Sequence, residues 1–491
     1  MSELELKFQV PEETLPSLLL ELGRHGVRSG RMLARYFDTN DGLLARHGLS
    51  LRLRKEGRRW VQTLKASGDS AVHRLEHNVP LRVQSGLQPA LDPGLHDTTE
   101  AGARLADLLS RADAPVLAER FTVEVWRRLS DVQVSGAVIE ASLDRGTIKA
   151  GGLSAPICEL ELEYKSGDPQ ALFALAKTWS GHGGLWLNTL SKSQRGSALA
   201  HGQAHAPPLN VGAPQLNRQL SGEGLFRAVL RSALDQVLAH ASEVASGNVG
   251  EEPIHQLRVG LRRLRTALRD LAPLSRGVDD AWATPLSAAF TRLGEVRDNE
   301  TVARAVRPLL EKAGAPKLEW AASAVRPDPV ATVRDAWFQA TLLDLLGFLH
   351  RDEVGASPMP QAQALKLIRQ RLSKLHKQVA LGGERFEQLP LQEQHRVRKR
   401  LKRLRYLVGF FQPLWPGRGA RRYLARLGPA QDALGRHNDI AVALENFRRD
   451  AEQDPKALFA VGYLQACLGN TARASRAALM RVTDRSRFWK R

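Results

Sequence analysis

The chain has 491 residues, of which 43% are hydrophobic and 25% charged, and its formal net charge is +19. This length allows two or three domains with substantial cores, and the presence of only two cysteines excludes a disulfide-stabilised scaffold. No apolar run approaches the roughly 20 residues of a membrane span, and the first residues lack the plan of a signal peptide, so we expect a cytoplasmic protein.

The positive charge is unevenly distributed along the chain. Residues 1–200 contain 25 Lys and Arg against 24 Asp and Glu, so their net charge is +1. The remaining residues contain 46 basic and 28 acidic side chains, which gives that part a net charge of +18. This excess predicts a polyanionic partner for the C-terminal part; charge alone leaves nucleic acid, an anionic membrane surface and polyphosphate as candidates.

The first segment, Glu3 to Val10, alternates polar and apolar residues with the period of a strand. Glu3, Glu5 and Lys7 share one face, with the two carboxylates roughly 7 Å apart along it. An edge strand with its charged face in water would show the same pattern, because antiparallel sheets often have one wet face. For this strand alone, the wet edge is the simpler interpretation.

Further segments with the same alternation change this interpretation. In chain order the sequence predicts a helix over 11–25, strands over 35–39, 49–55, 59–66 and 74–83, a helical stretch within 89–115, strands over 119–129, 132–144 and 156–165, and a helix over 170–181. About eight strands are enough to close a small barrel. Their polar faces hold the cations Arg52, Arg54 and Lys65 and the acids Glu76, Glu140, Asp144, Glu159, Glu161 and Glu163.

A sheet closed with these faces inward would hold carboxylates and cations in one wet channel. Carboxylates bind Mg²⁺ or Mn²⁺, and arginines and lysines bind phosphate oxygens, so together they form the two halves of a metal–polyphosphate site. The clustering therefore favours a functional site over a solvated face.

Several of these segments, in this order, resemble the CYTH superfamily, which contains inorganic triphosphatases, thiamine triphosphatases and class IV adenylate cyclases. The resemblance covers roughly residues 1–200. It rests on Glu-x-Glu-x-Lys at 3–7, Tyr36-Phe37-Asp38-Thr39, Leu51-Arg52-Leu53-Arg54, the strand ending in Lys65, Arg120, Asp144, Glu159-Leu160-Glu161 and Ser191-Lys192-Ser193.

The resemblance implies a closed triphosphate tunnel and a metal-dependent triphosphatase. The expected metal ligands for one or two Mg²⁺ or Mn²⁺ ions are Glu3, Glu5, Asp144, Glu159 and Glu161, with Glu140 and Glu163 assisting. The expected phosphate-binding side chains are Lys7, Arg52, Arg54, Lys65, Arg120 and Lys192. Glu76 is assigned to orient the attacking water.

Residues 201–222 are rich in His, Gly, Pro, Ala and Asn and indicate a linker. We divide the chain into a tunnel domain (1–202), a linker (203–220) and a helical domain (221–491). The fold class is thus multidomain α+β: a closed antiparallel β-barrel followed by an all-α bundle of about ten helices.

The helical part contains an internal repeat, for which we expect units of approximately 221–355 and 360–491 related by a pseudo-two-fold axis. The segment 255–265 aligns without a gap with 395–405, and Leu-Gly motifs at 293–298 and 434–439 follow, expected as turns. If residues 255–265 and residues 395–405 are helical, the basic side chains of each segment fall on one side of the helix and form a stripe. The stripes are His255, Arg258, Arg262 and Arg265, and His395, Arg398, Lys402 and Arg405.

A basic stripe is usually a solvated face, but the first stripe has no compensating acids on its helix and the arrangement recurs. It resembles the CHAD family (conserved histidine α-helical domain) over roughly 221–491, which implies binding of inorganic polyphosphate. The second stripe departs from the first at Lys402, which keeps the charge of Arg262 but loses its planar fork.

We therefore expect an enzyme that hydrolyses inorganic triphosphate while its helical domain binds polyphosphate, with association to polyphosphate granules as an extension. The alternatives are a non-catalytic polyphosphate-granule protein, and a CYTH enzyme acting on an organic triphosphate, as a thiamine triphosphatase or adenylate cyclase. Nucleic acid is a less favoured partner because aromatic residues are scarce near the stripes. The sequence leaves the oligomeric state open.

Overall fold

The computed structural model of the protein describes residues 2–70, 72–82, 88–111, 115–205, 213–318, 327–351, 359–415, 417–483 and 487–490. The chain divides into two compact units. The first comprises Met1–Val211, Leu234–Leu257 and Pro329–Asp352; the second comprises Gly212–Ala233, Arg258–Asp328 and Glu353–Arg491. No helix in the described part of the chain combines the length and the apolar character needed to span a membrane.

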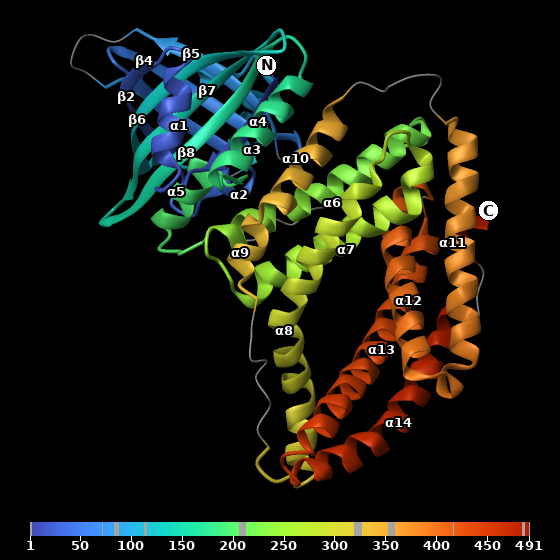
Figure 1. The fold of residues 1–491 in the computed structure, drawn as a ribbon. Helices are drawn as coiled ribbons and strands as arrows, with labels where there is room; N and C mark the ends of the chain where they lie inside the picture. The colour runs from blue at the N-terminus through green and yellow to red at the C-terminus, as the bar shows by residue number, and fades with distance from the viewer. Residues whose placement is uncertain are drawn as a thin grey trace. The chain divides into compact units, whose positions relative to one another are not determined.

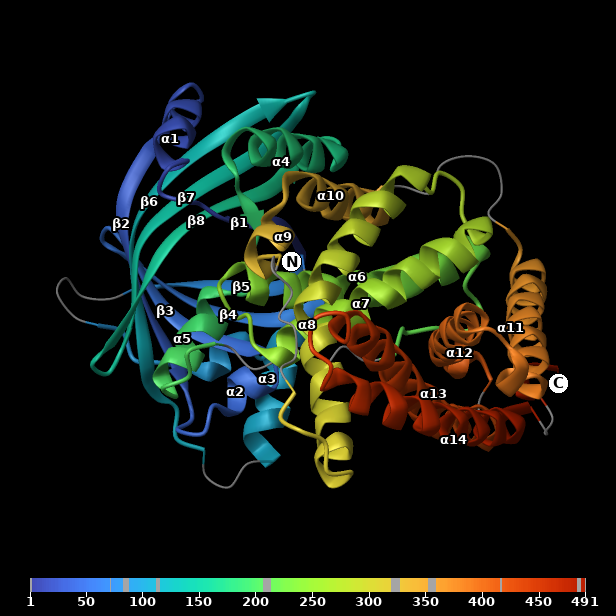
Figure 2. The same ribbon diagram turned by 60° about the horizontal axis from the view of Figure 1, so that its bottom comes forward.

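The first unit is built on an antiparallel sheet (Figures 1 and 2). Its strands are β1 (Ser2–Gln9), β2 (Arg28–Asp38), β3 (Leu49–Glu56), β4 (Arg59–Ser70), β5 (His73–Leu81), β6 (Ala118–Val134), β7 (Ala137–Ala150), β8 (Leu153–Ser166) and β9 (Trp186–Leu187). Its helices in the first 211 residues are α1 (Leu15–Gly23), α2 (Leu43–Arg46), α3 (Glu100–Arg111), α4 (Gln170–Gly183) and α5 (Lys192–Ala200), with a 3₁₀ turn η1 (Pro93–His96).

The nine strands form one sheet in the order β5-β4-β3-β2-β6-β7-β8-β1-β9. Its curl brings β5 to β1, but the two pair only over Ser2↔Leu75, Glu3↔Arg74 and Leu4↔His73, while the rest of β1 pairs with β8 and β9. The antiparallel sheet domain is therefore confirmed, but the expected closed barrel is not: a short contact, rather than a full ladder, joins the ends of the sheet.

Apolar clusters pack helices against both faces of this sheet. On one face, Met32, Val123 and Val125 belong to a buried cluster that also contacts Leu199 and Ala200 of α5. Another cluster joins the β3–β4 hairpin to α2 and α3; its members include Leu44, Leu51, Leu64, Ala101 and Leu105. Because side chains alternate along a strand, the first cluster lies on the same face as Arg52, which pairs with Tyr36 of that cluster, and the second lies on the opposite face.

The rest of the chain is helical, as its period predicts. The helices are α6 (Gly222–Ala245), α7 (Glu251–Leu271), α8 (Ala283–Lys312), α9 (Pro329–Arg334), α10 (Ala336–His350), α11 (Gln361–Glu384), α12 (Leu391–Phe411), α13 (Arg418–Asp450) and α14 (Ala457–Thr483). Short 3₁₀ turns are η2 (Ala272–Leu274), η3 (Asp280–Trp282), η4 (Phe386–Gln388), η5 (Gln412–Leu414) and η6 (Phe488–Lys490). α9 and α10 belong to the first unit.

The two halves of the helical part share some features. α7 and α12 each have 21 residues, end in a 3₁₀ turn, and precede the long helices α8 and α13. These parallels agree with the predicted repeat without establishing its pseudo-two-fold axis, which stays a prediction. The Leu-Gly motifs at 293–298 and 434–439 lie inside α8 and α13, so expecting them as turns was wrong.

Gly196 offers a test of the packing of α5. A Cβ at this position would lie 2.1 Å from Phe121 Cε2 and 2.2 Å from Cδ2, so Gly196→Ala should push α5 off the sheet. We expect urea titration to show a loss of about 1–3 kcal/mol in the free energy of unfolding. Gly181→Ala in α4 is the control, because its Cβ would meet nothing within 4 Å. Equal stabilities of the two variants would contradict the packing described.

Candidate functional site

The strand pairing places the predicted carboxylates on one face. Between β1 and β8, Glu5 pairs with Glu163 and Lys7 with Glu161. Between β7 and β8, Glu140 pairs with Glu163 and Asp144 with Glu159. Directly paired residues point to the same side of a sheet, so all seven side chains share a face. The alternation in the sequence alone was sufficient to find this set.

The same pairing extends the face to the predicted cations. Across β3, β4 and β5, Ser50 pairs with Lys65, and Lys65 in turn with Glu76. Arg52, two residues beyond Ser50, pairs with Tyr36 of β2 and therefore lies on this face as well. The face thus has an acid-rich side on β1, β7 and β8 and a cation-rich side on β3 and β4.

At the centre of the acid-rich side lies the ammonium group of Lys192, at the start of α5. Its Nζ lies 3.0 Å from Asp144 Oδ2, 3.0 Å from Glu159 Oε2 and 2.6 Å from Glu161 Oε1. The Asp144 and Glu159 side chains are fully buried and Lys192 is 7% exposed. Ser191 caps α5 with a capping box, which fixes the direction in which the helix begins at Lys192.

Two arginines that the sequence analysis did not assign complete this cluster. Arg127 Nε and Nη2 donate to the two oxygens of Asp144, each at 2.7 Å, and Nη2 also donates to Glu161 Oε2 at 3.0 Å. Arg195 donates to Glu159. Arg127 lies among the apolar residues of β6, in phase with Val123 and Val125, and that single cation in an apolar register was the signal available.

The cluster shifts the pKa values of its members. Burial alone would raise the pKa of Glu159, but Lys192, Lys7 and Arg195 outweigh burial and lower the pKa to about 2. Burial would also raise the pKa of Glu161, but Lys192 and Arg127 hold it well below its ordinary value. Burial would lower the pKa of Lys192, yet the carboxylates raise it well above its ordinary value. These groups therefore stay charged around neutral pH.

The neighbouring row of Glu5, Glu163 and Glu140 has less positive charge. Lys165 Nζ lies 2.7 Å from Glu163 Oε1 and 3.4 Å from Glu140 Oε1. Burial, with Glu140 and Glu5 nearby, still raises the pKa of Glu163. Excess carboxylate charge of this kind attracts a hard divalent cation. Among the described residues, however, no three His, Cys, Asp or Glu side chains stand at distances that would hold a metal ion; the Glu3 side chain lies outside the described residues.

The cation-rich side has fewer acids. Arg52 Nη1 donates to Tyr36 Oη at 3.0 Å, Arg54 Nε lies 2.9 Å from Glu56 Oε1, and Lys65 pairs with Glu76. Arg120 lies at an irregularity of the sheet: the register shifts between Tyr36↔Phe121 and Phe37↔Glu119, so Arg120 lies in a bulge opposite no residue. Its buried Nε has no hydrogen-bond partner among the described residues.

The first basic stripe lies on α7. The guanidinium carbons of Arg258, Arg262 and Arg265 lie 5.1, 5.5 and 5.2 Å from the centre of the Phe290 ring. Arg265 also donates to Ser287, and Arg258 to the Gly294 carbonyl. The aromatic face holds three like charges together and is itself a favourable partner for cations. His255, one turn earlier on α7, is half-buried.

The second stripe lies on α12. His395 Nδ1 and Asn438 Oδ1 are 2.9 Å apart, and Arg405 donates to Gln431 Oε1. Burial and the positive charges of Arg398, Arg262 and Arg258 lower the pKa of Lys402 to about 7. Since the arginines of α7 act on Lys402 of α12, the two stripes lie within electrostatic reach of each other.

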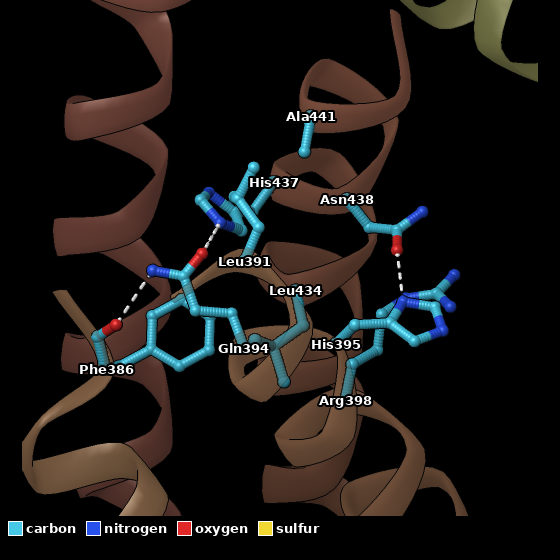
Figure 3. A pocket seen from close by; sticks show the side chains of 9 residues that line it. All are labelled: Phe386, Leu391, Gln394, His395, Arg398, Leu434, His437, Asn438 and Ala441. Carbon is cyan, nitrogen blue, oxygen red and sulfur yellow. Dashed lines mark hydrogen bonds between the residues drawn. The ribbon is translucent and has the colours of Figure 1, made fainter. Parts of the chain in front are cut away.

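A pocket borders the beginning of the second stripe. Its lining includes Phe386, Gln394, His395, Arg398 and His437. Figure 3 shows Gln394 between two partners: its Nε2 donates to the Phe386 carbonyl at 2.8 Å, and its Oε1 lies 2.7 Å from His437 Nε2. His395 and Arg398 project together on the other side of the view (Figure 3). The buried Gln394 amide is therefore fixed, and His395 and Arg398 contribute to the lining of the same pocket.

Comparison with known proteins agrees with both halves of the chain. The CYTH domain family matches residues 1–197, and the CHAD domain family matches residues 228–448. The chain joins a CYTH domain to a CHAD domain. The resemblance noted from the sequence is confirmed on both counts.

Individual relatives cover smaller parts. An inorganic triphosphatase of Haemophilus influenzae (strain ATCC 51907 / DSM 11121 / KW20 / Rd) is 32% identical over 171 residues, 34% of this chain and 46% of that protein. The chain thus matches less than half the length of this curated relative. The CHAD domain structure from Ricinus communis is 28% identical with a TM-score of 0.43, covering 56% of this chain and 96% of that one. A Hippeastrum structure, described as revealing a dominant triphosphatase activity, is 18% identical with a TM-score of 0.29, covering 41% and 96%. At these TM-scores neither structure bears on function.

Removal of the Lys192 ammonium tests the CYTH cluster. Lys192→Met should lower the free energy of unfolding by about 3–5 kcal/mol at pH 7, because buried carboxylates lose a partner. In the wild type, the lowered pKa of Glu159 stabilises the folded protein at pH values above 4.5, the ordinary pKa of a glutamate. This contribution is lost as the pH falls towards 2. The difference in the free energy of unfolding between the wild type and Lys192→Met, measured by urea titration, should therefore become smaller as the pH falls from 4.5 to 2.

The matched control is Lys177→Met in α4, whose exposed ion pair with Asp344 should contribute at most about 1 kcal/mol. A difference between Lys192→Met and wild type that stays constant from pH 7 to pH 2 would show that the carboxylates are not held by Lys192.

Proposed function

We propose that the CYTH domain hydrolyses inorganic triphosphate, on the concave face of its sheet, with the help of a divalent metal ion. The observation that supports this most is the division of one face into a cation-rich and an acid-rich side. A triphosphate needs cations for its oxygens, and a metal that bridges it to the protein needs carboxylates. The inorganic triphosphatase of Haemophilus influenzae, which is 32% identical to this chain over 171 residues, supports the choice of substrate.

The donor chemistry fits Mg²⁺ or Mn²⁺, which take oxygen ligands. The residues we propose to hold the ion are Glu5, Glu161 and Glu163, with Glu3 and Glu140 assisting. Glu5, Glu163 and Glu140 form the row with the smallest counter-charge, and Glu161 shares its positive partners Lys192 and Arg127 with other carboxylates. Asp144 and Glu159 are already neutralised by Lys192, Arg127 and Arg195, so we assign them to hold Lys192. When bound, the ion neutralises phosphate oxygens and draws electron density from the phosphorus.

The protein's own side chains bind and orient the substrate in this proposal. Arg52, Arg54 and Lys65 bind phosphate oxygens from β3 and β4, while Lys7 and Lys192 do so from the opposite side. Positive charge around the terminal phosphate stabilises the charge that develops on its oxygens and on the leaving group as water attacks. We assign Glu76, 6% exposed in its side chain and paired with Lys65, to orient that water. Arg120, held in a bulge, is assigned to the same phosphate-binding set.

Phosphate release from triphosphate, ATP and thiamine triphosphate, with Mg²⁺, Mn²⁺ or a chelator, tests this function. We expect hydrolysis of inorganic triphosphate that the chelator abolishes. Glu161→Gln should lower kcat/KM at least 100-fold, in the range found when one preorganised charged group is removed. Glu124→Gln, on the opposite face of β6 and paired with Arg31, should leave it unchanged.

A preference for ATP or thiamine triphosphate, or formation of a cyclic nucleotide, would move the assignment to an organic triphosphate. Absence of hydrolysis in every condition would leave a binding protein.

We infer a second function for the CHAD domain: binding of inorganic polyphosphate by the α7 and α12 stripes. Lys402 and the three arginines near it are half-buried or buried, and their mutual repulsion falls when an anion lies among them. The proposed binding set is His255, Arg258, Arg262, Arg265, His395, Arg398, Lys402 and Arg405. Granule association would follow from the same contacts.

The depressed pKa of Lys402 gives this proposal a pH signature. Bound polyphosphate favours the charged amine, so binding takes up a proton when the free amine is neutral. Affinity should therefore fall as the pH rises above about 7, by up to about tenfold per pH unit. Titration calorimetry in buffers of different ionisation enthalpy measures the proton uptake. Lys402→Arg should remove the uptake, since arginine stays charged.

Duplex DNA at the same salt concentration separates the polyanions. If DNA competes equally with long-chain polyphosphate, the stripes are a general polyanion surface, and the polyphosphate assignment fails.

A further inference from the structure

The segment Trp186–Ser191 leads directly into Lys192 and contacts the charged cluster. The Asn188 amide donates to the Lys7 carbonyl at 2.8 Å, and Lys7 Nζ donates to the Leu190 carbonyl. The Leu190 amide in turn donates to Asn188 Oδ1 at 3.0 Å. The backbone of this segment therefore sets the positions of both lysines relative to the carboxylates.

On its other side, the segment is held by residues from far later in the chain. The Thr189 amide donates to Ser242 Oγ of α6 at 2.9 Å, and the Leu187 amide donates to Gln339 Oε1 of α10 at 2.9 Å. The guanidinium of Arg334, at the end of α9, lies 3.6 Å from the centre of the Trp186 ring. These parts of α6, α9 and α10 fall in the same compact unit as the sheet, although the CHAD family match covers them.

Ser242 and Gln339 are held in single orientations. Ser242 is fully buried and its hydroxyl donates to the Leu238 carbonyl at 2.7 Å, so its lone pairs face the Thr189 amide. Gln339 is 2% exposed, and its Nε2 donates to the Val333 carbonyl at 2.6 Å, which turns Oε1 towards Leu187. Buried polar groups with every partner fixed rigidify what they bind.

We propose that Ser242 and Gln339 are positioning residues of the triphosphate site, so that helices of the CHAD domain complete the phosphate-binding geometry of the CYTH domain. They act through residues 187–190 on Lys7 and Lys192, and the Lys192 contacts of 2.6–3.0 Å with three carboxylates leave little room for displacement. This inference rests on the proposed phosphate-binding role of those lysines.

The test uses the full chain with Gln339→Met, which keeps the volume but removes the acceptor, and Ser242→Ala. Each should raise KM for triphosphate about tenfold with a smaller change in kcat, as loss of a supporting contact does. Ser242→Thr keeps the hydroxyl and should restore the wild-type KM.

Asp344→Asn is the matched control. It breaks the Lys177–Asp344 ion pair between α4 and α10 without contacting residues 186–191, so KM for triphosphate should stay unchanged. Thermal unfolding of every variant shows whether a substitution destabilises the whole protein. If Gln339→Met and Ser242→Ala fold and match the wild type in KM, the positioning role is overturned.

Calorimetric titration with triphosphate in the absence of divalent metal separates this inference from the proposed function. If the wild type binds triphosphate in this titration but does not hydrolyse it when Mg²⁺ or Mn²⁺ is added, and the variants bind about tenfold more weakly, hydrolysis fails and positioning stands. If the wild type hydrolyses triphosphate with metal and the variants bind equally well, positioning alone fails. If the wild type neither binds triphosphate in this titration nor hydrolyses it with metal, both proposals fall.

Discussion

The charged face of the CYTH domain depends on one buried ammonium. Lys192 brings together carboxylates of β7 and β8 that would repel one another strongly with no cation between them. Desolvating such groups is costly, and the cost is offset only because Arg127, Arg195 and Lys7 add further partners to the same carboxylates. The result is a preorganised set of charges in the place where a polyanion and a metal ion would have to be bound.

The register of this face was accessible from the sequence, because a strand's two-residue period fixes the side on which a residue lies. Glu5, Lys7 and Glu161 could therefore be grouped across 150 residues without knowing the fold. The partners of each charge could not be predicted in this way. Arg127 was hidden among apolar residues, and the bulge at Arg120 interrupts the two-residue period of β6, so only the family resemblance indicated that arginine.

The ends of the helices and the contacts between distant segments could not be predicted from the sequence periodicity either. Sequence periodicity gave helices for the C-terminal part, but the Leu-Gly motifs, expected as turns, continue inside α8 and α13 because glycine is tolerated in a packed helix. The contacts of Ser242 and Gln339 with residues 187–189 join segments separated by more than fifty positions, and isolated polar residues in apolar helices give no indication of such partners.

The Phe290 ring, which lies close to three arginines of α7, makes the two stripes differ in how well lysine can replace arginine. Stacking on a ring suits a flat guanidinium, so lysine should be a poor substitute along α7. The residue three positions before the second Leu-Gly pair is Gln431, a neutral amide that contacts only Arg405 among the stripe residues whose hydrogen bonds are described. A glutamine stacks no guanidinium, so exchange of arginine for lysine at position 405 should disturb the stripe of α12 less than the same exchange on α7.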